Sequence, residues 1–154
     1  MSRRIRRLRK GGVELRLPEV ERAFLRSLAP EMREVFGTAD DPAMARLFPI
    51  AYPEDEERQE EYRLLAHTEL MESHLAALAT LEASADSEHL SPEEADHWMR
   101  ALNEVRLVLG SRLDVSEEGH ERPVEADDPR APVFAAYDYL SMLQGELVEA
   151  LAGY

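Results

Sequence analysis

The chain of 154 residues has a formal net charge of −14, and 44% of its residues are hydrophobic while 32% are charged. This length and balance predict one soluble globular domain, residues 1–154, with an apolar core of its own. The absence of cysteine excludes disulfides, thiolate zinc sites, iron–sulfur clusters and a thiol redox switch within these residues.

No apolar run approaches the roughly 20 residues that a membrane span requires. The basic N-terminus is not followed by the apolar segment of a secretory signal, since Ile5 and Leu8 stand alone among arginines. We therefore expect a cytoplasmic protein that has no membrane partner.

The charge is unevenly distributed along the chain. Residues 1–16 hold seven of the 18 basic residues and one acidic residue, a net charge of +6, whereas the remainder carries −20. An acidic body repels nucleic acid, so any contact with phosphate is expected to run through residues 1–17, the basic hairpin arm. The candidate binding residues are Arg3, Arg4, Arg6, Arg7, Arg9 and Lys10.

The arm is predicted to form a small β-hairpin. Residues 13–17 alternate apolar and charged side chains, which is the period of a half-buried strand, and Gly11-Gly12 supplies a turn. The arginines then have two interpretations. They contact nucleic acid or polymerase, or they form a charged edge that blocks strand aggregation or docks on the protein's own acidic body.

Apolar residues recur every four positions after the arm and predict a first helix over about residues 18–37. This stripe contains Val20, Phe24, Leu28, Met32 and Phe36. Pro30 lies inside the helix and predicts a kink. Asp41 suits the N-cap of a short helix over residues 42–47.

The acidic run 54–61 begins the longest predicted helix, which extends to about Ala83. Its apolar face contains Leu64, Met71, Leu75, Leu78 and Leu81. His67 and His74 fall on the same face. They are interpreted as neutral core or rim histidines with hydrogen-bond partners, as a pH-sensitive packing element, or as a pair of metal ligands.

A capping box, Ser91-Pro92-Glu93-Glu94, begins the next helix, which ends at Gly110 or continues to Leu113. Its buried stripe is predicted to contain Trp98, Leu102, Val105 and Leu109. Glu94 and His97 also have the spacing of carboxylate-rich metal sites, although the cap competes for Glu94. The alternative metal site therefore consists of His67, His74, Glu94 and His97.

Residues 114–130 predict an exposed acidic loop, because they contain turn residues and little to bury. A last helix then starts at residue 128 or residue 131 and runs towards residue 151. Its stripe contains Val133, Tyr137, Leu140, Leu147 and Leu151. Gly145 is expected to permit close contact with a neighbouring helix.

Three polar residues lie on or beside the stripes of two helices that are expected to pack together. They are Asn103, Arg106 and Gln144. Half-buried polar groups need partners, so a polar network between the helices is predicted, which either fixes the packing or shapes a binding surface.

Motifs of common enzyme classes are missing from the sequence. There is no phosphate-binding glycine loop, no nucleophile elbow and no HExxH motif. We therefore predict a non-enzymatic protein without a cofactor.

The run Trp98–Gly110, WMRALNEVRLVLG, resembles the signature of the actinobacterial AosR-like family, once known only as a domain of unknown function. A second similar segment is Tyr137–Gln144, YDYLSMLQ, and the order of the preceding elements is also similar. The resemblance implies a cytoplasmic regulator of transcription that works with a stress sigma factor and RNA polymerase. The family's characterised regulator senses oxidation through a cysteine pair, which this chain lacks, so the resemblance implies partner binding without thiol sensing.

These observations predict an all-α fold, a bundle of four to five helices with a small N-terminal β-hairpin. The predicted function is a regulatory interaction protein that acts on transcription through a sigma factor, RNA polymerase or DNA. The alternative is a helical bundle that binds a metal or small ligand. A homodimer whose acidic surface recruits a basic partner is a third interpretation.

Overall fold

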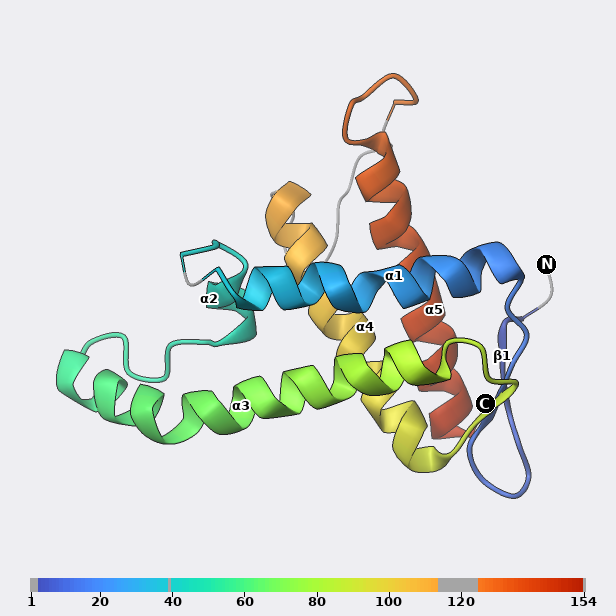
Figure 1. Ribbon diagram of the computed structural model, residues 1–154, viewed down its shortest axis with the longest axis horizontal. Coiled ribbons are helices and arrows are strands. Elements are labelled where there is room, and N and C mark those ends of the chain that lie inside the picture. Colours follow the sequence, from blue (N-terminus) through green and yellow to red (C-terminus); the bar gives the residue numbers. More distant parts are fainter. Residues whose placement is uncertain (1–2, 39, 114–124, 154) are drawn as a thin grey trace.

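The computed structural model describes residues 3–38, 40–113 and 125–153, which form five helices and three short strands (Figure 1). In chain order they are β1 (Ile5–Arg7), β2 (Val13–Leu15), α1 (Glu19–Phe36), α2 (Met44–Leu47), α3 (Glu56–Ser84), β3 (His89–Leu90), α4 (Pro92–Leu113) and α5 (Ala131–Ala152). The predicted all-α class with an N-terminal hairpin is confirmed. Of the predicted acidic loop, residues 114–124 lie outside the described part of the chain.

Helix α4 lies at the centre of the helical arrangement. It contacts both α3 and α5, while α1 packs along α3 (Figure 1). The face of α4 that meets these helices is fully buried at Trp98, Ala101 and Leu102. Trp98 satisfies its one polar atom there, because its Nε1 donates a hydrogen bond of 2.7 Å to Ser84 Oγ at the end of α3.

Two hydrogen bonds mark the start of α4. The Ser91 amide donates to the Glu94 carboxylate at 2.9 Å, and the Glu94 amide donates to Ser91 Oγ at 3.1 Å. This reciprocal pair confirms the capping box. The helix continues through Gly110 to Leu113, and α1 likewise stays helical through Pro30.

A three-stranded antiparallel sheet forms at the hairpin, in the order β1-β2-β3. Ile5 pairs with Leu15, and Val13 pairs with Leu90 on the other side. The sequence does not predict strand β3, since two residues are too few to give a recognisable period. Gly12 has φ +78°, and a Cβ there would come within 2.1 Å of the Leu90 carbonyl oxygen, so this turn requires glycine.

Some side chains predicted to be buried are exposed. Val20 is 76% exposed, Leu64 66% and Leu151 40%. The apolar period identified the correct helices, but it carries no information about whether a neighbour covers each turn. Gly145 is also a correction, because a Cβ built there would meet no atom within 4 Å, so it mediates no close helix contact.

The first half of α3 extends beyond the other helices, at the end of the molecule opposite the hairpin (Figure 1). All the residues of α3 from Glu60 to Leu65 are exposed, whereas the second half buries Ala77, Leu78 and Leu81. Within the described ranges, no helix is long and apolar enough to cross a membrane.

A comparison of a buried leucine with an exposed leucine tests the core. Leu102→Ala should lower the free energy of unfolding by about 2–5 kcal/mol, because it leaves a cavity in the fully buried face of α4. Leu65→Ala, at a position that is 79% exposed, should change it by less than about 0.5 kcal/mol. Urea denaturation followed by circular dichroism measures both, and equal losses would contradict this description of the core.

Candidate functional site

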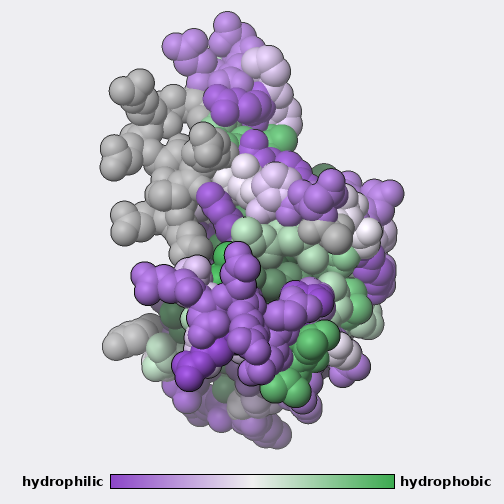
Figure 2. Space-filling model, turned by 90° about the vertical axis from the view of Figure 1, so that its left-hand side faces the viewer, coloured by the Kyte–Doolittle hydropathy of each residue, from purple (hydrophilic) through white to green (hydrophobic). Residues whose placement is uncertain are grey.

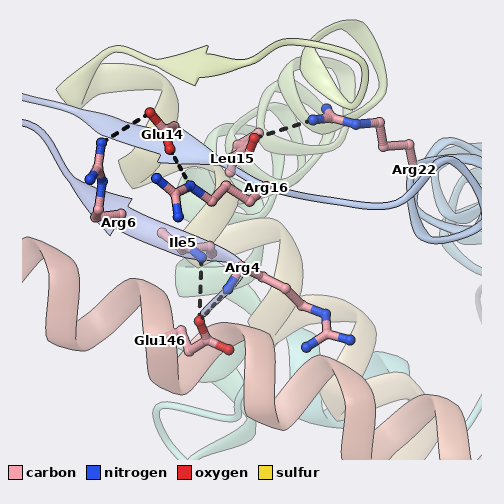
Figure 3. A network of polar contacts seen from close by, with 8 residues as sticks. All are labelled: Arg4, Ile5, Arg6, Glu14, Leu15, Arg16, Arg22 and Glu146. Carbon is pink, nitrogen blue, oxygen red and sulfur yellow. Dashed lines mark hydrogen bonds and ion pairs between the residues drawn. The ribbon is translucent and has the colours of Figure 1, made fainter. Parts of the chain in front are cut away.

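The basic hairpin is docked on the helical body and does not extend from it as a free arm. Ile5 and Val13 are fully buried, and Leu15 is 3% exposed. The outer edge of β1 faces α5, where Glu146 Oε1 accepts hydrogen bonds from the amides of Arg4 at 2.8 Å and Ile5 at 3.3 Å (Figure 3). This carboxylate therefore closes the edge of the sheet that would otherwise be open.

Three of the six predicted binding cations form ion pairs with nearby glutamates. Arg3 Nη2 lies 2.7 Å from Glu149, Arg4 Nε lies 2.7 Å from Glu21, and Arg6 Nη2 lies 3.2 Å from Glu14. These contacts tie β1 to α5, to α1 and to β2. Glutamates of the same chain therefore neutralise most of the positive charge of these three arginines.

The pKa values of the glutamates reflect these pairs. Hydrogen bonds from Arg16 and Arg6 hold the pKa of Glu14 below its ordinary value (Figure 3). At Glu21, burial acts to raise the pKa, but hydrogen bonds led by that from Arg4 outweigh it and hold the pKa below its ordinary value. Both carboxylates thus stay charged and paired.

Among the described residues, the other three predicted binding cations are not engaged in ion pairs of this kind. Arg7, Arg9 and Lys10 are exposed, and none of them forms an ion pair with any residue that the structure describes. Arg9 and Lys10 lie in the turn of the hairpin, and Arg7 ends β1 beside Gly153. The structure thus divides the predicted group of six into a paired half and an available half.

Arg22 of α1 is a structural cation that the sequence gave no reason to single out. Its guanidinium donates hydrogen bonds of 2.7–3.3 Å to four backbone carbonyl oxygens, those of Leu15, Leu17, Ala85 and Ser87. It therefore joins β2 to the segment that leads into β3. Figure 3 shows the contact with Leu15. Its separation of 63 and 65 residues from two acceptors explains why no local pattern reveals this role.

A second titratable site lies inside the helical core. His74 of α3 is 8% exposed and Glu104 of α4 is 2% exposed. The Nδ1 atom of His74 contacts Glu104 Oε1 in a short hydrogen bond, and its Nε2 lies 3.1 Å from the Leu47 carbonyl oxygen at the end of α2. The imidazole also stacks on Phe36 at a centroid distance of 5.7 Å.

These contacts restrict where the protons of the His74–Glu104 pair can lie. A carbonyl oxygen only accepts, so His74 Nε2 carries a proton and donates to Leu47. One further proton then lies between His74 Nδ1 and Glu104, either on the carboxyl or on the imidazole. Burial raises the pKa of Glu104 and outweighs the opposing influence of His74 and the nearby Arg100. The second oxygen of Glu104, Oε2, is buried without a hydrogen-bond partner among the described residues.

The four residues of the predicted metal site have separate environments. Both ring nitrogens of His74 are occupied, and His67 stacks on Phe48 at a centroid distance of 4.4 Å. Glu94 belongs to the capping box at the start of the same helix as His97. In the described part of the chain, no three histidine or acidic side chains come together as a metal ion would require.

The predicted polar network is present between α4 and α5, with different members. Arg106 donates to Gln144 Oε1 and, at 2.8 Å, to Ser141 Oγ, and its guanidinium lies over the Tyr137 ring at 5.5 Å. Asn103 is a correction, because it is exposed and forms no hydrogen bond with the described residues. It lies one position outside the buried face of α4, where Leu102 and Glu104 turn inward.

Comparison with known proteins identifies a family model and several named relatives that are similar to the chain. A family model described as "Domain of unknown function (DUF2017)" matches residues 2–151. Proteins named oxidative stress regulator AosR in Mycobacterium bovis and Mycobacterium tuberculosis are 29% identical to the chain over 130 residues, which cover 73% of it and 59% of each relative. A protein of Mycobacterium leprae that bears the AosR name is 31% identical over 129 residues, with the same coverage.

The chain thus spans about three fifths of the length of these relatives. No solved structure matches it. The resemblance to the AosR-like family that the sequence indicated is confirmed by these matches.

The buried pair predicts a pH dependence of stability. Because the pKa of Glu104 is raised in the folded chain, its contribution to stability is fully present below the ordinary pKa of 4.5 and is lost as the pH rises through the raised value. Glu104→Gln replaces the carboxyl group by an amide of similar size, which does not titrate. The free energy of unfolding of the wild type, measured relative to that of E104Q, should therefore fall as the pH increases from about 4.5. Urea titrations at several pH values measure this difference, and a difference that does not change with pH would contradict the shared-proton description.

Docking of the hairpin predicts a role for Glu146 that Glu149 does not share. Glu146→Ala leaves two backbone amides of β1 without their acceptor and should cost about 1–3 kcal/mol. Glu149→Ala removes only an exposed partner of Arg3 and should cost less than about 1 kcal/mol. Thermal denaturation of the two variants at one pH provides the comparison. Equal stability of the two would argue against Glu146 as the anchor.

Proposed function

We propose that this chain, which belongs to the DUF2017 family, is a non-enzymatic regulator of transcription that acts by binding a macromolecular partner in the cytoplasm. The names of its relatives as oxidative stress regulators support a regulatory role. The partner we propose is a sigma factor or RNA polymerase, contacted through the hairpin. DNA is the alternative target of the same surface.

The observation that carries this proposal is the division of the hairpin's basic residues into an ion-paired group and a group with no ion pair in the described part of the chain. Arg7, Arg9 and Lys10 are exposed and have no acidic partner among the described residues, on a chain whose remainder carries a net charge of −20. Cations that a protein needs only for folding are usually engaged, as Arg3, Arg4 and Arg6 are here. An unpaired basic group on an acidic protein is therefore best explained by an acidic surface or phosphate on a partner.

Binding to DNA and binding to a protein partner should differ in their dependence on salt. Binding to DNA releases counterions, so its affinity falls steeply with salt, whereas a protein interface with an apolar component responds less. The net charge of −20 on residues 17–154 opposes the approach of DNA. This repulsion favours a protein partner that presents a local acidic patch.

The chain contains no cysteine, so the proposed regulator does not detect oxidation through a thiol within these residues. A stress signal would have to reach it through its partner or through a ligand. We therefore propose partner binding as the function of the chain and assign the chemistry of sensing to another component.

A triple substitution tests the hairpin as the binding surface. Arg7→Ala, Arg9→Ala and Lys10→Ala together should weaken binding to RNA polymerase holoenzyme by about ten-fold or more, since all three cations are available. A matched control replaces the ion-paired and exposed Arg3, Arg6 and Arg16 by alanine, which removes the same charge. The control should lose less than about three-fold in affinity.

Biolayer interferometry over a range of salt concentrations measures both variants against the holoenzyme and against duplex DNA. Wild-type affinity of the Arg7, Arg9, Lys10 variant for both targets would refute the proposal. Binding to DNA alone, with a steep salt dependence, would replace the protein partner by DNA.

A further inference from the structure

The end of the molecule opposite the hairpin carries a groove that the proposed function does not use. It lies between the first half of α3 and the segment that contains α2 and residues 48–50, and its volume is about 460 Å³. Its lining is mostly apolar, with aromatic and sulfur-containing side chains; it includes Phe36, Met44, Phe48, Ala66, Leu70 and Met71. A volume in this range accommodates more than one bulky side chain.

The groove is held open by contacts within the chain. Gln59 Oε1 accepts hydrogen bonds of 2.9 Å from the amides of Ala51 and Tyr52, which fix the outer wall to α3. Phe48 stacks on His67 at 4.4 Å and meets Phe36 edge-on at 6.4 Å, which forms the floor. Because these contacts already exist in the free chain, an occupant would bind a formed site.

The rim of the groove exposes apolar surface to solvent. Ile50 is 62% exposed, Tyr62 37% and the neighbouring Leu64 66%. Figure 2 views the molecule from this end and shows green apolar residues beside the purple charged ones. Apolar side chains gathered around a preformed pocket are typical of a protein-binding surface.

The start of α3, at one end of the groove, is strongly acidic, and Arg63, which lines the groove, pairs with Glu60. Residues 54–61 contain six acidic residues, of which Asp55 and Glu60 form ion pairs with Arg58 and Arg63. The other four, Glu54, Glu56, Glu57 and Glu61, are exposed and form no ion pair with the described residues. An occupant with positive charges next to its apolar side chains would satisfy both features.

The geometry favours an α-helix as the occupant. The groove follows α3 from Gln59 to Met71, a distance of ~18 Å at the rise of an α-helix, which matches about three turns of a second helix. We infer that this groove binds a basic amphipathic helix of a protein partner. The helix inserts bulky apolar side chains into the pocket and places lysines or arginines near the acidic start of α3.

A second copy of the chain fits this groove less well. Two-fold pairing would bring two segments with six acidic residues each into one interface, where their charges repel. The binding surface proposed for the hairpin is basic and lies at the other end of the molecule (Figure 1). The groove therefore gives the chain a second, independent contact of opposite charge.

The test uses the full chain and a fluorescent synthetic peptide of ~18 residues, with leucine and phenylalanine at helical spacing and lysine elsewhere. Two control peptides accompany it. One is scrambled with the same composition, and one keeps the apolar positions but carries glutamate in place of lysine. Fluorescence anisotropy should give an affinity for the amphipathic basic peptide that is about ten-fold or more above that of both controls.

Two variants locate the binding. Ala66→Trp fills the pocket and should abolish the advantage of the amphipathic peptide, whereas Leu65→Trp, on the exposed side of α3, should preserve it. Replacing Glu54, Glu56, Glu57 and Glu61 by glutamine should weaken binding by about ten-fold. The matched control changes the exposed Glu93, Asp96, Glu125 and Asp127 to glutamine or asparagine and alters the net charge equally. It should lose less than about three-fold.

Several outcomes would overturn the inference. One is equal binding of the scrambled peptide, and another is unchanged affinity in both Ala66→Trp and the four-glutamate variant. Sedimentation of the chain as a dimer that Ala66→Trp dissociates would identify a second copy as the occupant. Binding of an apolar fluorescent dye that Ala66→Trp abolishes, without binding of the peptide, would assign the groove to a small molecule.

Discussion

The hydrogen bonds that Glu146 accepts from β1 are the interaction on which the arrangement of charge depends. They place a hairpin with six cations in its first ten residues against a body that is strongly acidic. With β1 along α5, Arg3 pairs with Glu149 of α5 and Arg4 pairs with Glu21 of α1. The cations further along the hairpin pass beyond these carboxylates. Docking therefore creates the distinction between structural and available arginines.

A similar dependence links the core to the groove. His74 connects the end of α2 to α3 and α4, because one ring nitrogen bonds the Leu47 carbonyl and the other bonds Glu104. Phe48 follows Leu47 directly and forms the floor of the groove through its contacts with Phe36 and His67. The buried pair thus fixes the position of a surface feature.

The parts of the fold that could be predicted from the sequence are those set by local periodicity and caps. The stripe at Trp98 and Leu102 and the box at Ser91 need only a few neighbouring residues, and both predictions are confirmed. The exposure of Val20 and Leu64 could not be predicted, because it depends on where other helices end. Glu104 has no local sequence signal, because only the packing of α4 on α3 brings it to His74, 30 positions away in sequence.

The candidate site shows the same limit. The sequence identified all six cations of the hairpin, but the division between them follows from glutamates that lie up to 146 positions away. Among the polar residues predicted between the helices, Arg106 contacts Gln144 but Asn103 is exposed, because the helical period does not show how far the neighbouring helix covers each side of the stripe. The sequence contains no indication of the groove. It forms where α2 and residues 48–50 cross α3, and neither segment has a regular pattern of its own.

The central proposal is that the exposed cations of the hairpin turn bind the partner while the helical body keeps its packing. Hydrogen–deuterium exchange of the full chain, alone and with RNA polymerase holoenzyme, tests it most directly. The account predicts slower exchange at the hairpin turn, residues 8–12, with little change in the buried part of α4 beyond its existing protection. Protection confined to the exposed faces of α4 and α5, with no change at the hairpin, would contradict it.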